Sequence, residues 1–248
     1  MLKSRIIPVL TFNGFALVKT RKFSNPRMVG NPVQAARVYN NRGVDELIFL
    51  DIFATRQKRK INLKIVKEVI KECFMPVGIG GGIESLEDIN NLLKIGADKV
   101  IIKNKALLSP TFIKESSNFF GSQCISISLD VTKHHGSFVI HNDLNMHLPL
   151  IDFIKKMEDS GAGEFILNSV DNDGEMNGFD IDLVIQSEGV SSLPIVCVGG
   201  AGNLDHYAEL FTKTNCDSVG SASIFHFTQY TPLDIKLKLA SIGRPVRI

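Results

Sequence analysis

The chain contains one half-chain pattern twice. Four strand-like apolar runs of the first half have counterparts in the second: residues 5–11 and 124–130, 46–51 and 164–169, 77–82 and 196–201, and 98–102 and 217–221. The final residues of the first pair, Thr11 and Asp130, are 119 positions apart, and the other pairs keep about that spacing. Repeats of solenoids and propellers are shorter, about 20 to 50 residues, so this pattern predicts two half-barrels.

Longer segments with the apolar spacing of helices separate these runs, which predicts parallel strands joined by crossover helices. Helices are expected at about residues 33–42, 61–73, 85–95, 110–119, 149–160, 181–188, 203–213 and 233–241. Eight strands alternating with eight helices close a (β/α)8 TIM barrel, an α/β fold for which 248 residues is a typical length. No Gly-, Pro- or Ser-rich linker is evident, so we expect one barrel domain over residues 1–248, with half-barrels at about 1–120 and 121–248.

Composition argues against several classes of partner. The formal net charge is only +2 and the basic residues are scattered, apart from the run at residues 56–60, so no nucleic-acid partner is expected. The sequence shows neither a signal peptide nor an apolar run long enough to span a membrane, so no membrane partner is expected. The four cysteines form no CxxC pair, which is typical of reduced thiols and predicts a cytoplasmic protein.

The reactive groups of such a barrel lie at the C-terminal ends of its strands. Glycine-rich segments at residues 80–82 and 199–202 each end a strand and precede a helix, whose N-terminus favours an anion. Asn104 and Ser223 follow the next strand of each half and are placed to donate to the same anions. Two such sites on one face suit a ligand with a phosphate at each end. The alternative is that these glycines only permit tight turns.

Asp130 ends its strand and points a carboxylate into the mouth of the predicted barrel, whereas its repeat counterpart is Thr11. Two carboxylates can divide general-acid and general-base roles, but a carboxylate facing a hydroxyl cannot. Asp130 is therefore the candidate catalytic residue, with a structural role in binding loop amides as the alternative. None of the six histidines has a metal or catalytic-triad spacing, so no metal and no cofactor are expected.

Four charged residues open strands at the opposite, N-terminal end of the barrel: Arg5, Glu46, Lys99 and Glu164. Inward-facing charges must pair, because an unpaired buried charge is very costly. A structural plug of ion pairs is one interpretation, and a gate at this end is the other.

The chain resembles the cyclase subunit of imidazole glycerol phosphate synthase along essentially its whole length. The resemblance rests on residues 5–8, 18–19, 45–47, 80–82, 96–100, 120–123, 161–164, 171–174, 199–202 and 223–227. It implies a barrel that docks a glutaminase at its N-terminal face and passes ammonia through its centre. Arg5, Glu46, Lys99 and Glu164 match the family's ammonia gate, and Asp98 matches an acidic residue of the glutaminase interface. The implied phosphate-binding residues are Gly82, Asn104, Asp173, Gly174, Gly200, Ala222 and Ser223.

Two positions depart from the family pattern. The family's cyclase uses aspartates at the ends of both the first and the fifth strand, and only Asp130 remains, with Thr11 at the other place. Lys103 and Asn104 stand where the family has an Asn-Thr pair at its first phosphate site. The segments at residues 17–26, 29–32 and 72–76 are similar to the acetamidino-modification branch of this family. In that branch the barrel works with a glutaminase and an ATP-dependent amidotransferase that makes acetamidino sugars for surface glycans.

Three functional hypotheses follow. The first is a barrel subunit that channels ammonia to acetamidino-sugar formation without cyclase chemistry, as Thr11 favours. The second is an active cyclase of histidine biosynthesis, as whole-chain similarity favours. The third is a scaffold that binds its partners without conducting ammonia. The related isomerase of histidine biosynthesis fits less well, because it has no use for a charged gate. Whether the barrel catalyses a reaction of its own stays open at this stage.

Overall fold

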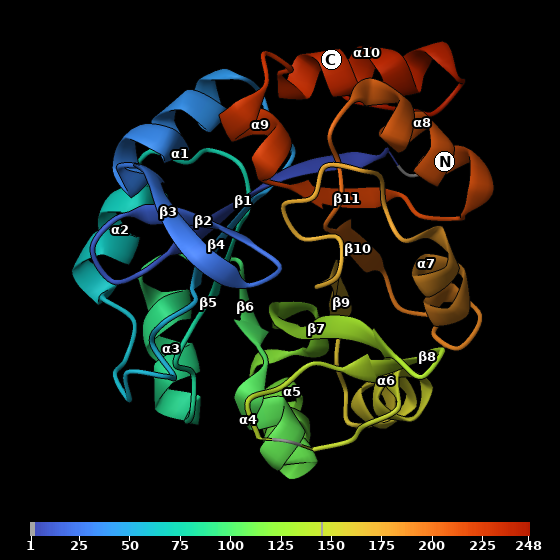
Figure 1. The fold of residues 1–248 in the computed structure, drawn as a ribbon. Coiled ribbons are helices and arrows are strands. Elements are labelled where there is room, and N and C mark those ends of the chain that lie inside the picture. The colour runs from blue at the N-terminus through green and yellow to red at the C-terminus, as the bar shows by residue number, and fades with distance from the viewer. Residues whose placement is uncertain (1–2, 145) are drawn as a thin grey trace.

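A closed barrel of parallel strands forms the centre of the computed structural model, which describes residues 3–144 and 146–248 (Figure 1). Its strands are β1 (Arg5–Phe12), β4 (Leu47–Asp51), β5 (Val77–Gly80), β6 (Lys99–Ile102), β7 (Ile125–His134), β9 (Glu164–Ser169), β10 (Ile195–Val198) and β11 (Ser218–Ser221). They pair in chain order, and β11 pairs with β1 in the register Arg5 to Ser218, which closes the barrel. The predicted (β/α)8 fold is confirmed.

Helices surround this barrel where the periodicity predicts them. They are α1 (Pro32–Asn41), α2 (Leu63–Lys71), α3 (Leu86–Lys94), α5 (Pro110–Phe120), α6 (Leu150–Asp159), α7 (Ile181–Glu188), α8 (Leu204–Lys213) and α10 (Pro232–Ser241). Side-chain caps fix most of their starts: Ser85 and Asp88 form a capping box on α3, and Asn203 accepts from the first turn of α8. Such caps satisfy backbone N–H groups that have no partner within the helix.

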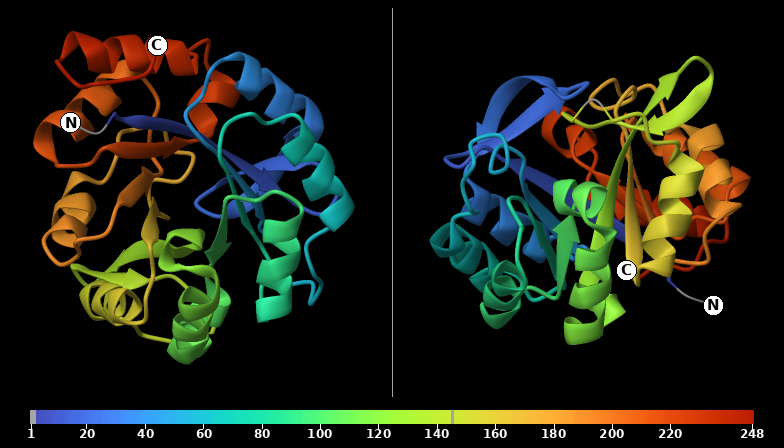
Figure 2. Two further views of the ribbon diagram at one scale, coloured as in Figure 1. Left: turned by 180° about the vertical axis from the view of Figure 1, so that it is seen from behind. Right: turned by 90° about the horizontal axis from the view of Figure 1, so that it is seen from below.

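Several elements fall outside that prediction, all within the connections between barrel strands and helices. They are β2 (Leu17–Arg21), β3 (Ser24–Gly30), β8 (Ser137–Ile140), α4 (Asn104–Leu108), α9 (Ser223–Phe227) and the 3-10 turn η1 (Ser122–Cys124). The antiparallel hairpins β2–β3 and β7–β8 project from the same end of the barrel (Figure 2, right). His134 is the last residue of β7 and so belongs to the β7–β8 hairpin. Short insertions lack the 3.6-residue or alternating pattern that identifies an element over several turns.

Two apolar clusters make up the core. The larger fills the space between barrel and helices, as expected for a fold that covers a parallel sheet on its outer face. The smaller lies in the barrel lumen and comprises Ile7, Val9, Ile48, Ile101, Ile166 and Val196. All four cysteines are free thiols, with Cys197 and Cys216 buried and the other two half-buried. Across the described residues, no helix is both long and apolar enough to cross a bilayer.

Candidate functional site

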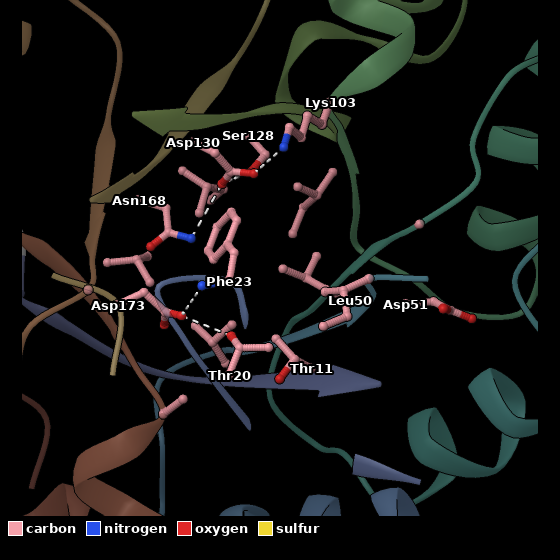
Figure 3. Close-up of a pocket in the computed structure, with 18 of the residues that line it drawn as sticks. Thr11, Thr20, Phe23, Leu50, Asp51, Lys103, Ser128, Asp130, Asn168 and Asp173 are labelled. Carbon is pink, nitrogen blue, oxygen red and sulfur yellow. Dashed lines mark hydrogen bonds and ion pairs between the residues drawn. The ribbon is translucent and has the colours of Figure 1, made fainter. Parts of the chain in front are cut away.

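A cavity of about 710 Å³ opens at the C-terminal ends of the barrel strands, beside the β2–β3 hairpin (Figure 3). Every residue predicted for catalysis or phosphate binding lines it: Thr11, Gly82, Asn104, Asp130, Asp173, Gly174, Gly200, Ala222 and Ser223. Parallel strands place these groups together, because their carboxyl ends all meet at one rim of the barrel. The structure thus brings the candidate residues into one pocket, and their individual roles remain proposals.

Asp130, at the C-terminal part of β7, has three polar neighbours and is only 7% exposed. Lys103 Nζ lies 2.6 Å from its Oδ2. Its Oδ1 accepts longer hydrogen bonds from Asn168 Nδ2 at 3.3 Å and from Ser128 Oγ at 3.4 Å. Figure 3 shows Lys103 and Asn168 meeting Asp130 from two sides. A ligand that approaches Oδ2 must therefore displace or share the Lys103 ammonium.

Thr11 offers no acid or base to complement Asp130. Its hydroxyl donates a short hydrogen bond to the carbonyl of Val18 in β2, so it ties β1 to the hairpin. The pocket therefore contains one of the two carboxylates that the cyclase pattern requires. In the repeat, Asn168 aligns with Leu50, and both line the pocket.

Asp51, at the end of β4, is a buried carboxylate to which sequence reasoning assigned no role. It accepts backbone hydrogen bonds from Phe53 and Ala54, and the guanidinium of Arg59 contacts both its oxygens, at 2.5 and 2.9 Å. The hydrogen bond to Asp51 raises the pKa of Arg59. Through these contacts, Asp51 stabilises the loop that contains residues 56–60.

Asp173 fastens the β2–β3 hairpin over the pocket. Its carboxylate forms a buried ion pair with Lys19 and accepts from the Thr20 hydroxyl at 2.8 Å and the Phe23 amide at 3.3 Å. Phe23 in turn lies 5.8 Å from the Lys103 ammonium, within the range of a cation–π contact. Lys19, Thr20 and Phe23 were not predicted as site residues, since their hairpin has no periodic signal of its own.

The second-half phosphate candidates form a tight backbone cradle. Gly200 has φ +105°, and a Cβ there would lie 1.9 Å from the Gly178 carbonyl oxygen, so only glycine fits. At Gly174, φ is +74°, and a Cβ would lie 2.7 Å from the Thr20 oxygen. Ser223 is 7% exposed, and its hydroxyl has no hydrogen-bond partner among the described residues. A buried hydroxyl without a partner at the pocket wall fits an anionic ligand that would accept a hydrogen bond from it.

The first-half candidates have a different chemistry. Gly82, with φ +65°, packs against the Arg59 carbonyl, and Asn104 is the first residue of the short helix α4. Lys103 precedes Asn104 and directs its ammonium toward Asp130. This half therefore has a cation where the second half has a glycine-lined cradle.

At the opposite end of the barrel, the four predicted gate residues form a closed ring of ion pairs. Arg5 contacts Glu46 at 2.8 Å and Glu164 at 2.7 Å, and Lys99 contacts Glu164 at 2.7 Å. Lys99 Nζ also lies 2.9 Å from Glu46 Oε1, but this oxygen has no hydrogen bond of acceptable geometry. The contact between Lys99 and Glu46 is therefore an ion pair without a hydrogen bond. We call these four residues the charge ring.

Burial and pairing act in opposite directions on the charge ring. Burial alone would raise the pKa of Glu164, but the charges of Arg5 and Lys99 outweigh it and lower that pKa. Burial likewise works to lower the pKa of Arg5, and the two glutamates raise it. The ionised forms of Glu164 and Arg5 are therefore favoured inside the ring.

The lumen between the charge ring and the pocket is apolar. Ile7, Ile48 and Val196 are fully buried there, and Val9 and Ile101 continue the cluster to the pocket, which they also line. Such a lumen excludes ions, because a charge without a partner is very costly away from water, but it does not exclude a small neutral molecule in the same way.

Asp98, the predicted interface residue, is exposed at the N-terminal end of β6. Its Oδ2 accepts from the Val77 amide at 2.8 Å, so part of this carboxylate holds β5 and β6 together. Within residues 3–144 and 146–248, no group of His, Cys, Asp and Glu side chains is arranged to hold a metal ion.

Comparison with known proteins adds a family assignment to this geometry. The family model described as histidine biosynthesis protein matches residues 5–231. The chain is 38% identical over 251 residues to the imidazole glycerol phosphate synthase subunit HisF of Natranaerobius thermophilus, and 39% identical to that of Streptococcus mutans. It is also 39% identical over 252 residues to the HisF subunit of Bacillus cereus, and each of these alignments covers all of both chains. The chain therefore belongs to the histidine biosynthesis protein family and, within it, to the HisF family of imidazole glycerol phosphate synthase subunits.

Proposed function

We propose that this chain is the barrel subunit of a glutamine amidotransferase complex and receives ammonia from a glutaminase that docks at the charge-ring end. The observation that carries this proposal is the series of charge ring, apolar lumen and polar pocket along one barrel axis. A neutral molecule such as ammonia suits this lumen, whereas ammonium does not. A partner subunit agrees with the relatives' being subunits of imidazole glycerol phosphate synthase.

The charge ring is the proposed gate. In the closed arrangement Arg5 and Lys99 each bridge the same two glutamates, so moving one cation aside leaves its partners with the other. Removing a partner from a buried pair altogether costs about 3–5 kcal/mol. A swing of one cation is therefore the less costly way to open the barrel.

For the reaction at the pocket, we propose ammonia delivery for acetamidino-sugar formation in surface glycan biosynthesis. An ATP-dependent amidotransferase would be the third component, and the pocket would hold a phosphorylated or otherwise anionic ligand at Gly174, Gly200 and Ser223. Thr11 and the Lys103–Asp130 pair support the loss of two-carboxylate cyclase chemistry. The free cysteines favour a cytoplasmic setting.

Cyclisation in histidine biosynthesis is the second candidate. The relatives fit this function better than the sugar-modifying one, since each is an imidazole glycerol phosphate synthase subunit. In that case Asp130 would need a catalytic partner that is not a carboxylate, because position 11 is a threonine. The third candidate, a scaffold that conducts no ammonia, would leave the charge ring as a structural plug.

Two measurements separate these candidates. Purified chain with ammonium and the ribulosyl precursor of the cyclase reaction tests histidine chemistry, and turnover at the family's normal rate would refute the proposed loss of that activity.

In the reconstituted complex, product from glutamine is compared with product from added ammonium. We expect Arg5→Lys to lower the amount of product made from glutamine but not the amount made from added ammonium. Arg37→Lys on α1 is the matched control and should change neither. An unchanged amount from glutamine in folded, docked complexes would make the ring a plug.

The anion cradle has a separate test. Crystals grown in phosphate should show an anion beside Gly200 and Ser223, and Ser223→Ala should weaken phosphate binding. A site that stays filled by water at high phosphate concentration would refute the second-half cradle, while leaving the ammonia route untouched.

A further inference from the structure

A second cavity, of about 440 Å³, adjoins the pocket at the β2–β3 hairpin. It lies between the hairpin, the segment that follows β9 and the end of α9, and it shares Lys19, Thr20, Asn25 and Gly174 with the pocket. We call it the hairpin groove. None of the proposed ammonia, catalytic or phosphate functions uses its other lining residues. Because both cavities share one wall, a ligand in the groove can extend a group into the pocket.

Among the residues that the structure describes, Arg27 is the one charged residue of the groove without an ion-pair partner. Arg21 forms a bidentate pair with Glu175, at 2.6 and 2.9 Å, and Lys19 is neutralised by Asp173. Arg27, which faces Lys19 across the hairpin register, forms no ion pair with any residue that the structure describes. Arg27 is exposed and lines the wall of the groove, where its guanidinium can contact a phosphate through two parallel hydrogen bonds.

The groove also has an exposed aromatic wall. Phe227 ends α9 and is 52% exposed, although the rest of that short helix is fastened to the barrel by buried Ile224. An aromatic face beside an arginine suits a ligand in which a flat ring is joined to phosphate, since bases stack on aromatic side chains. Gly174 contributes too, because the absence of a Cβ lets the hairpin approach the segment after β9 and close the floor of the groove.

We propose that the hairpin groove binds a nucleoside diphosphate, with its phosphates at Arg27 and its ring against Phe227. The cavity volume is in the range of small-molecule sites. A sugar attached to the second phosphate would enter the pocket past the shared residues Lys19 and Asn25. That last step rests on the proposed sugar-modifying function, whereas binding of the nucleoside diphosphate does not.

The test is calorimetric titration of the full chain, without a glutaminase, with uridine diphosphate as the probe. We expect Arg27→Gln to weaken binding about tenfold or more, since a hydrogen bond to a charged group contributes about 1.5–3 kcal/mol. Phe227→Ala should weaken it about fivefold or more. Lys22→Gln is the matched control, because it removes one positive charge from the same hairpin without lining the groove.

Other outcomes overturn the proposal. No binding at millimolar uridine diphosphate would refute it, as would equal losses in the Arg27 and Lys22 variants. Weakening by Lys103→Gln alone would place the probe in the pocket. Inorganic pyrophosphate that binds as tightly as uridine diphosphate would exclude recognition of the ring. Since no ammonia is used, these results do not depend on the charge ring being a gate.

Discussion

The ammonium of Lys103 lies 2.6 Å from the carboxylate of Asp130, which joins the residue after β6 to the neighbouring strand β7 at the pocket wall. Sequence comparison treated these residues separately, one as a retained aspartate and the other as a departure from the phosphate-site pattern. Their contact shows that the two departures from the cyclase pattern, at Thr11 and at Lys103, both change the surroundings of Asp130. Thr11 stands where the cyclase pattern has a second carboxylate, and the Lys103 ammonium contacts one oxygen of Asp130.

On the proposed loss of cyclase chemistry, restoring that activity should need two changes. We expect the double variant Thr11→Asp with Lys103→Asn to convert the ribulosyl precursor, in the presence of ammonium, about 10²-fold or more faster than the unmodified chain. Thr11→Asp alone should gain less, because Lys103 still occupies Asp130. Chromatographic detection of the imidazole product gives the rates. Equal activity in the single and double variants would show that Lys103 does not restrain Asp130.

Acid should destabilise the fold through Glu164. Its pKa is lowered in the folded protein from an ordinary value of 4.5, so the stability it contributes is fully present above pH 4.5 and is lost as the pH falls through the folded value. Urea unfolding between pH 7 and pH 3 should show a steeper loss for the unmodified chain than for Glu164→Gln. Glu68→Gln removes a carboxylate from an exposed pair on α2 and should leave the acid slope nearly unchanged.

The cradle glycines should differ sharply in their tolerance of alanine. Gly200→Ala combines positive φ with a Cβ 1.9 Å from the Gly178 oxygen, so we expect more than about 3 kcal/mol of destabilisation. Gly43→Ala has φ +61° but nothing within 4 Å of its Cβ, and should cost only about 1–2 kcal/mol. Thermal and urea unfolding measure both. Similar losses would mean that the backbone at Gly200 shifts at little cost.

Two lysines on one helix should have very different effects on stability. Lys236 of α10 is 3% exposed, donates to the Gly43 carbonyl at 2.7 Å and pairs with buried Asp45, which also accepts from the Ile6 amide. Lys236→Met should cost about 3–5 kcal/mol, because it strands the Asp45 charge. Lys238 pairs with Asp205, whose side chain is 84% exposed, so Lys238→Met should cost about 1 kcal/mol or less. Urea unfolding compares them, and equal losses would contradict the importance of burial.

Strongly periodic features could be predicted from the sequence. The repeat and the alternation of strand-like and helical segments indicate the barrel, since each local pattern agrees with the same closed architecture. The strand-end rule then places Asp130, Gly200 and Ser223 at one rim. Four charges at strand starts predict ion pairing at the other end, because unpaired inward charges are too costly.

The hairpins, the partners of each charge and the hairpin groove were decided only by tertiary structure. Residues 17–30 carry no periodic signal, so nothing local predicts that Lys19 reaches Asp173 or that Arg27 has no ion-pair partner within residues 3–144 and 146–248. Lys103 and Asp130 are 27 positions apart and meet only because β6 and β7 are neighbours in a closed barrel. The sequence by itself determined the fold and which chemical groups reach each rim of the barrel. Periodicity can be recognised within each short segment, and the order of the segments then places the strand ends. Which of those groups touch was decided by the packing of distant segments, because contact distance depends on how the whole chain closes.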